Sequence, residues 1–307
     1  TGINDLPFFR SSHWSELTPT ISRSPNSRAA LRYAICPECT GSNPPVTITI
    51  FIKIFTVIYT HKYRMTPAIA NTEPIDCACV IHGTGYDWIY VDRLYNMLCR
   101  HLTRPVRLHV YTESHRPVPD HMIKHSLQDW GFAGPKKSWW YKLQLFNTQH
   151  HVGPMLYFDL DVVIVNNIDW LWQLPLRHFW TIRDFKYLWK SNWTGVNSSV
   201  MWWDTTQYKH IWETVVKQDI NFFTAKYRGD QDFVSDVIPV TQRRFFHTEW
   251  VKSWRWECLN GGFNFRSRKY SNPDSGTTLS KETSILVFHG SPNPHETTDP
   301  VIAKHWQ

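Results

Sequence analysis

The sequence predicts an α/β domain over residues 76–307, because short apolar strands alternate there with amphipathic helices. The prediction rests on the first part of this domain. It contains an apolar strand at 77–82, a turn with two glycines, apolar residues at helical spacing over 89–102, and a second strand at 106–112. The chain has 307 residues, of which 42% are hydrophobic and 19% charged. This composition allows a substantial buried core and excludes a wholly disordered protein.

The later elements follow in the same alternating pattern. Asp87 is expected to cap the helix over 89–102. The remaining pattern predicts strands at 154–165, 179–182, 198–203 and 284–289, and helices at 137–147, 205–217 and 230–237. A strand–turn–helix–strand beginning is typical of nucleotide-binding α/β domains, whose ligands lie beyond the carboxyl ends of the strands.

Residues 1–75 have a different composition, rich in Ser, Thr, Pro and Asn, with no sustained helical period. We expect a poorly structured N-terminal extension there. Its apolar run at 46–59 contains Lys53 and is shorter than the roughly 20 residues of a membrane-spanning helix, so a strand or an ill-packed segment is favoured over an unusual anchor. A secretory signal is not expected, since the first 30 residues lack an apolar core segment. Whether this extension belongs to the functional protein stays open.

The net charge of +7 is spread along the chain, without the Lys/Arg block typical of nucleic-acid binding, so no nucleic-acid partner is expected. Cys36 and Cys39 form a lone CxxC pair, which is a weak zinc signal. The other four cysteines are expected to be buried thiols: Cys77, Cys79, Cys99 and Cys258. Because nothing requires disulfides, a cytoplasmic location is expected, with peripheral association at a membrane as an option.

Asp159 and Asp161 interrupt the apolar segment at 154–165. Alternate residues of an extended segment point the same way, so both carboxylates can face one cation. Burying two like charges is costly unless a metal or another partner neutralises them, and carboxylate oxygens suit Mg²⁺ or Mn²⁺. The pattern alone is weak, because Asp230 and Asp232 share it; a capped turn is the alternative. The setting at the end of an apolar strand favours a metal site.

Four further motifs accompany the aspartate pair. They are SWWYKLQLF at 138–146, GVNSSVMWW at 195–203, GDQD at 229–232 and VFHGSPNP at 287–294. In this order the five motifs resemble the GT-A-fold glycosyltransferases, in particular family 8 and its bacterial relatives of the glycogenin and lipopolysaccharide galactosyltransferase types. The resemblance runs from about residue 76 to the C-terminus. It implies a single GT-A-type, Rossmann-like domain with a mixed central sheet.

The resemblance also implies roles for individual residues. Asp159, Asp161 and His289 match the metal ligands, and Asp230 and Gln231 match a catalytic pair near the reacting sugar carbon. The donor-binding positions of the family match Tyr86, Lys142, Asn197 and Gly290. Three departures are visible: Gly290 follows His289 directly, where the family has two residues between histidine and glycine; Asn293 stands where the family has a lysine before proline; and Ser199 stands in place of a glycine. Lys142 or Lys281 can supply the missing positive charge near a diphosphate.

The residues themselves leave simpler interpretations open. Tyr86 also fits a core or loop position, Lys142 a solvated helix position, and Asp230 a helix N-cap.

The function implied by the resemblance is a metal-dependent glycosyltransferase, of the hexosyltransferase kind, with Mn²⁺ or Mg²⁺ as cofactor. The expected donor is a nucleotide-diphosphate sugar, with a UDP-sugar favoured, and the acceptor is a glycan, a lipid-linked glycan or a protein. The resemblance implies retention of anomeric configuration. Inversion with Asp230 as general base is an alternative, and so is a non-catalytic nucleotide-sugar or carbohydrate-binding protein.

Overall fold

The computed structural model describes residues 73–132, 135–264, 267, 269–270 and 275–307. The expected extension at 1–75, with Lys53, Cys36 and Cys39, therefore lies outside the described residues except for its last three positions, and the domain boundary stays a prediction. None of the helices in the described part of the chain has both the length and the apolar composition of a membrane span.

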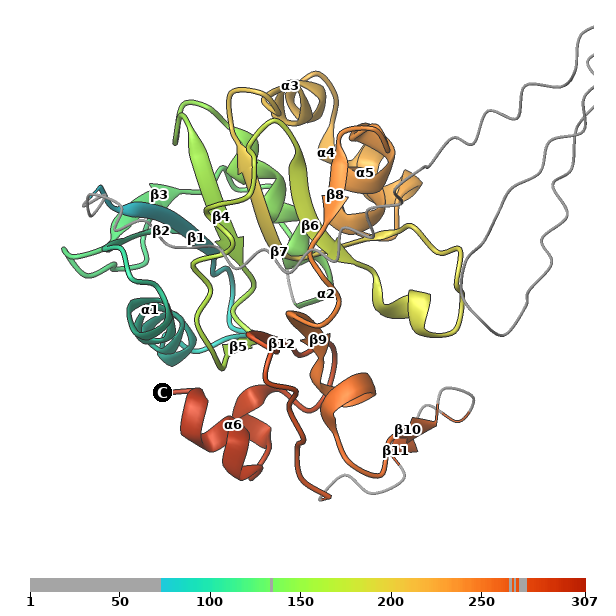
Figure 1. Ribbon diagram of the computed structural model, residues 1–307. Helices are drawn as coiled ribbons and strands as arrows, with labels where there is room; N and C mark the ends of the chain where they lie inside the picture. Colours follow the sequence, from blue (N-terminus) through green and yellow to red (C-terminus); the bar gives the residue numbers. More distant parts are fainter. Residues whose placement is uncertain (1–72, 133–134, 265–266, 268, 271–274) are drawn as a thin grey trace, which may run out of the picture. The chain divides into compact units, whose positions relative to one another are not determined.

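A mixed sheet of seven strands forms the centre of the domain (Figure 1), with strand order β3-β2-β1-β4-β7-β6-β8. The first four of these run parallel, and β7 is antiparallel to both of its neighbours. The strands are β1 Ile75–Val80, β2 Val106–Thr112, β3 Ile123–Ser126, β4 Pro154–Phe158, β6 Phe179–Arg183, β7 Val196–Asp204 and β8 Arg243–Phe245. The predicted α/β class with a mixed central sheet is confirmed.

Both faces of this sheet are covered, so alternate residues of its central strands enter two different cores. Cys77 and Cys79 of β1 pack in the core that includes helix α1, Ile89–His101, whereas Ala78 packs in the other core with Trp140 and Phe233. The second core contains residues from η1, a 3₁₀ helix at Trp139–Phe146, and from α3 His210–Val216, α4 Ile220–Lys226 and α5 Asp230–Val237.

The predicted helix after the first turn is confirmed as α1. The N-cap is Trp88, without a side-chain cap hydrogen bond, and not the expected Asp87. The Asp87 carboxylate nevertheless accepts a hydrogen bond from the Ile89 N–H at 3.0 Å, which satisfies one of the donors that a helix start leaves unpaired. Five residues on one face are buried: Tyr90, Val91, Leu94, Met97 and Leu98. Cys99 turns to the opposite side and is exposed, so the expectation of a buried thiol is wrong there but correct for Cys77, Cys79 and Cys258.

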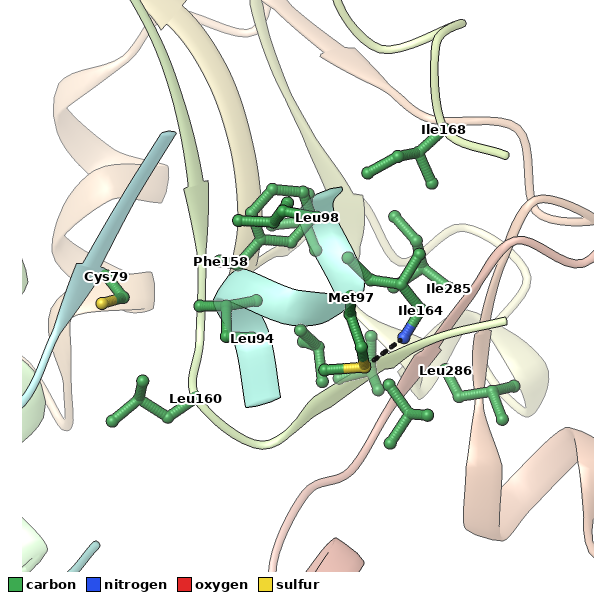
Figure 2. Close-up of a cluster of buried hydrophobic side chains, with 14 of the residues drawn as sticks. Cys79, Leu94, Met97, Leu98, Phe158, Leu160, Ile164, Ile168, Ile285 and Leu286 are labelled. Carbon is green, nitrogen blue, oxygen red and sulfur yellow. Dashed lines mark hydrogen bonds between the residues drawn. The ribbon is translucent and has the colours of Figure 1, made fainter. Parts of the chain in front are cut away.

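A smaller sheet, β5-β12-β9, packs against α1. Its strands are β5 Val162–Ile164, β12 Ile285–Val287 and β9 Val251–Ser253. Figure 2 shows Met97 of α1 reaching this sheet, where its sulfur accepts a hydrogen bond from the Ile164 N–H at 3.3 Å. Leu94, Ile164, Ile285 and Leu286 surround this contact, so one apolar cluster joins the small sheet to the helix.

The single strand expected at 154–165 is in fact two strands, β4 in the large sheet and β5 in the small one. The chain leaves β4 at Asp159, whose N–H donates to the Ser199 carbonyl at 2.8 Å, and turns before Val162. The two aspartates therefore occupy the crossing between sheets, a position that apolar content alone does not reveal.

Other differences concern short elements. The helix expected at 137–147 is a four-residue α-helix, α2 Pro135–Ser138, followed by η1, and the helix expected from 205 begins only at His210. Several elements were not predicted: β3, β8, β9, α4, the 3₁₀ turn η2 Phe185–Leu188, the π-helical turn η3 Trp254–Cys258, the pair β10 Phe263–Asn264 and β11 Lys269–Tyr270, the 3₁₀ turn η4 Pro294–Glu296, and α6 Pro300–His305. These elements are at most seven residues long, which gives too few residues for a period to show.

Candidate functional site

The candidate site lies where β4 ends. Asp159 and Asp161 follow this strand, and Tyr86 follows the neighbouring parallel strand β1. Lys142 comes from η1, and Asp230 begins α5, which packs against β7. Four separate segments thus bring side chains to the carboxyl ends of the central strands, which is where ligands bind in open α/β sheets.

Lys142 is the centre of the charge network. Its Nζ lies 2.7 Å from Asp159 Oδ1 and 3.8 Å from Asp230 Oδ2, although the residue is only 9% exposed. Burial by itself lowers the pKa of a lysine, but the two carboxylates raise the pKa of Lys142 by more, so the amine stays charged. The alternative of a solvated helix position is therefore wrong for this lysine, whereas its donor-binding role stays a prediction.

Asp230 is buried at the first position of α5 and makes two contacts with the network. The Ser198 hydroxyl donates to its Oδ2 at 2.6 Å, and Lys142 Nζ in turn donates to the Ser198 oxygen at 3.4 Å. Burial raises the pKa of Asp230, while Lys142 and Ser198 counteract this rise. Ser198 therefore links the lysine to the second carboxylate, a role that sequence reasoning missed although the residue lies within the 195–203 motif.

Asp161 completes the group on the other side of Asp159. The Tyr86 hydroxyl donates to Asp161 Oδ2 at 3.1 Å. Burial, together with the charge of Asp159, raises the pKa of Asp161 to about 7. Burial and the same two carboxylates also raise the pKa of Tyr86, so its hydroxyl remains a hydrogen-bond donor.

Tyr157 supports Asp159 from within β4. Its hydroxyl donates to Asp159 Oδ1 at 2.6 Å, and Lys142 Nζ lies 5.6 Å from the centre of its ring. Sequence reasoning missed this residue as well. Tyr157 precedes Asp159 by two positions, and in an extended segment residues at this spacing point to the same side.

The site contains three carboxyl groups but one ammonium. An excess of negative charge away from water is unfavourable unless protons or a bound cation neutralise it. The raised pKa of Asp161 shows that its charged form is unfavourable here. Asp159 and Asp161 have hard oxygen donors that interact with each other at the carboxyl end of the central strand β4, so the residues present fit a divalent cation such as Mn²⁺ or Mg²⁺.

His289 is in a different environment from the aspartate pair. Its Nε2 lies 2.6 Å from the Ser253 hydroxyl, and its ring stacks on Phe185 and meets Trp256 edge-on. Burial and nearby Arg255 lower the pKa of His289 to about 3, so the imidazole is neutral. Within the described residues, its ligand nitrogens do not form a group of three within 4.8 Å with the two aspartates.

Three further predicted site residues are the catalytic candidate Gln231 and the donor-binding candidates Asn197 and Gly290. Asn197 is buried on β7, where its side-chain oxygen accepts from the Ser199 N–H at 3.0 Å. Gln231 is half-buried beside Asp230 on α5. Gly290 has a φ of +76°, and Arg255 Nη1 would lie 3.2 Å from a Cβ at this position.

Arg255 contacts the backbone of the C-terminal motif. It donates to the backbone carbonyls of His289, at 2.8 Å, and Ser291, at 2.7 Å. Asn293 instead caps the 3₁₀ turn η4, with its N–H donating to Glu296 at 2.5 Å. Nothing in the sequence pattern pairs Arg255 with residues 289–291, because it lies more than 30 positions upstream.

No protein-family model and no curated protein sequence matches the chain. Among solved structures, an active-site mutant of LgtC is similar, with a TM-score of 0.53 and 11% identity, over 75% of this chain and 93% of that one. The glycosyltransferase GlyE of Streptococcus pneumoniae TIGR4 is similar with a TM-score of 0.55 and 13% identity, over 76% of this chain and 60% of that one. The chain thus spans less than two thirds of GlyE. At these identities the likeness concerns the fold, which is of the GT-A type and resembles that of family 8 glycosyltransferases.

Proposed function

We propose that this protein is a metal-dependent glycosyltransferase that uses a nucleotide-diphosphate sugar. The observation that carries the proposal is the charged group at the carboxyl ends of the central strands, in which Lys142 and Asp230 are buried and Asp159 and Asp161 are half-buried. LgtC is a galactosyltransferase and GlyE a glycosyltransferase, so two proteins of similar fold perform this class of reaction. A fold hosts many functions, and the charged group is therefore the stronger support.

Asp159 and Asp161 are the residues proposed to hold a divalent cation. When bound, the cation supplies positive charge that stabilises the diphosphate as the bond to the sugar breaks. Lys142 pairs with Asp159 and fixes its orientation, and the Tyr86 hydroxyl orients Asp161 through a hydrogen bond. His289 is retained as a proposed ligand only through the resemblance, since its ring lies in the group with Ser253 and Phe185.

Asp230 and Gln231 are proposed to face the reacting sugar carbon. Asp230 is held by Lys142 and Ser198, so its carboxylate has a fixed position beside the metal-binding pair. Retention of the anomeric configuration is the proposed outcome, and Tyr86, Asn197 and Gly290 are the proposed donor-binding residues. NMR analysis of the product anomer distinguishes retention from inversion with Asp230 as general base.

The identity of the donor can be found from ligand stabilisation. UDP, GDP and CDP are each added with and without Mn²⁺, and the melting temperature is measured. The proposal predicts that one nucleotide, with UDP favoured, raises the melting temperature only when Mn²⁺ is present. Equal melting temperatures for all three nucleotides with and without the ion would contradict a nucleotide-sugar site.

A second candidate, a non-catalytic nucleotide-sugar-binding protein, is favoured by one observation. Asn293 replaces the lysine of the family motif, and in the structure it caps a 3₁₀ turn. No positive side chain is thereby supplied to a diphosphate from that position. Nucleotide sugars incubated with the protein and Mn²⁺ separate the two candidates, because a pure binding protein releases no nucleoside diphosphate.

A further inference from the structure

A second group of potential metal ligands lies at the opposite ends of the central strands from the candidate active site. It consists of Asp76 near the start of β1, His109 on β2, and His151, three residues before β4. One ligand atom from each residue lies within 4.8 Å of the other two, and the described residues contain no other such group of three.

Strand register places Asp76 and His109 together. The parallel pairing of β1 with β2 sets Asp76 beside Arg107 and Ala78 beside His109, so Asp76 and His109 project from the same face of the sheet. His109 is only 4% exposed, and its Nε2 lies 2.7 Å from Asp76 Oδ1. The His151 ring meets the His109 ring edge-on, with 5.0 Å between ring centres.

Hydrogen bonds outside the group orient both imidazoles. His151 Nε2 lies 3.0 Å from the Pro154 carbonyl. A carbonyl only accepts, so Nε2 carries the proton and Nδ1 keeps its lone pair. His109 Nδ1 lies 2.8 Å from His125 Nε2, and the His125 ring stacks on Tyr111. A partner on the far nitrogen of a ligating histidine is the usual arrangement at metal sites.

We propose that Asp76, His109 and His151 bind one zinc ion, with a fourth position left to water. Two imidazoles and one carboxylate match the ligand types that Zn²⁺ prefers, and three protein ligands with one open position is a common zinc coordination. The ion would connect β1, β2 and the segment before β4. This site is separate from Asp159 and Asp161 and does not depend on the proposed transfer reaction.

Arg107 is the group that competes with a cation here. Its guanidinium makes a two-point ion pair with the Asp76 carboxylate, in which Nη2 lies 2.7 Å from Oδ2. The Arg107 side chain is 46% exposed, however, so it can move into solvent while Asp76 turns one oxygen to the metal. In the absence of zinc the same residues form an ion-paired polar group, which is the alternative that the experiment must exclude.

The test is titration of the chelator-treated full chain with ZnCl₂, followed by isothermal calorimetry. The proposal predicts one zinc per chain, and an affinity at least about tenfold weaker in His151→Gln. His115→Gln is the matched control, since His115 is exposed and lies outside the group, and its affinity should equal that of the unmodified protein. His151 lies in the segment before β4, so this variant is expected to fold; circular dichroism checks it.

Three results would overturn the proposal: no zinc bound by the unmodified protein, equal affinity in His151→Gln, or equal weakening in His115→Gln. A second variant, Asp161→Asn, distinguishes the two sites. It should lose any Mn²⁺ effect on nucleotide binding while still binding one zinc as tightly as the unmodified protein. Loss of zinc binding in Asp161→Asn would place the ion at the candidate active site and contradict the proposed site.

Discussion

Lys142 Nζ and Asp159 Oδ1 are 2.7 Å apart, and this ion pair joins the 3₁₀ helix η1 to the end of β4 inside the protein. Asp230 lies on the other side of the same ammonium, at 3.8 Å. A single buried lysine therefore sits between two carboxylates that arrive from different parts of the chain.

Replacing the lysine should destabilise the protein strongly. Lys142→Met leaves the half-buried Asp159 and the buried Asp230 without their cation, and breaking a buried ion pair costs about 3–5 kcal/mol. Lys209→Met is the control, because Lys209 pairs with Glu213 on an exposed helix surface, where such a pair contributes roughly 0.5 kcal/mol or less. The free energy of unfolding, measured in urea, checks both values. Equal losses in the two variants would mean that Lys142 is not held in a buried network.

Asp161 should make stability depend on pH. The pKa of this carboxyl is about 7 in the folded protein against an ordinary 3.8, so it loses its proton at higher pH folded than unfolded. The free energy of unfolding should consequently fall as the pH rises from about 4 through 7, because the ionised form is less favourable inside the protein. Asp161→Asn removes this component, so its stability relative to the unmodified protein should increase over that range. Parallel curves for the two proteins would contradict the raised pKa.

Tyr86→Phe tests the hydrogen bond to Asp161. The Tyr86 hydroxyl stabilises the ionised carboxylate, and its removal should raise the pKa of Asp161 further. The midpoint of the pH-dependent change in stability should move upward by a measurable amount. Tyr95→Phe serves as the control, since Tyr95 lies on α1 and has no hydrogen bond to the aspartates. An unchanged midpoint in Tyr86→Phe would show that its hydroxyl does not interact with Asp161.

Gly290→Ala should destabilise the loop after His289 for two reasons. Its φ of +76° is unfavourable for any residue with a Cβ, at about 1–2 kcal/mol, and Arg255 Nη1 would lie 3.2 Å from that Cβ. Gly131→Ala has a similar φ of +69° with nothing within 4 Å of the added atom, so it measures the backbone effect alone. Thermal unfolding should show the larger loss at Gly290. An equal or larger loss at Gly131 would mean that the Arg255 contact has no cost.

Much of the candidate site could be predicted from the sequence, because its residues lie in short motifs beside strong secondary-structure signals. Asp159 and Asp161 stand out within an apolar run, and Lys142 and Asp230 lie in motifs of the order typical of family 8. Local sequence does not show which residues connect these motifs. Ser198 and Tyr157 act through side-chain hydrogen bonds that exist only once β4, β7 and α5 have packed.

The fold was predicted best where an element is long and strongly patterned. The strand at 106–112 and the helix at 230–237 have the predicted bounds, and the turn between β4 and β5 was missed because both strands are apolar. The environment of His289 and its contact with Arg255 depend on the parallel pairing of β12 with β9. Pairings between strands far apart in the sequence leave no local signal, and the zinc group of Asp76, His109 and His151 was missed for the same reason.

The most direct test of the proposed function is Mn²⁺-dependent release of nucleoside diphosphate from nucleotide sugars. The unmodified protein, Asp161→Asn and Asp232→Asn are compared; Asp232 has the same Asp-x-Asp spacing but pairs with the exposed Arg228. We predict that the unmodified protein and Asp232→Asn release nucleoside diphosphate. Asp161→Asn should release none, although its melting temperature at pH 5 should not fall below that of the unmodified protein. Release by a folded Asp161→Asn protein at the unmodified rate would contradict the assignment of the metal site and, with it, the central claim.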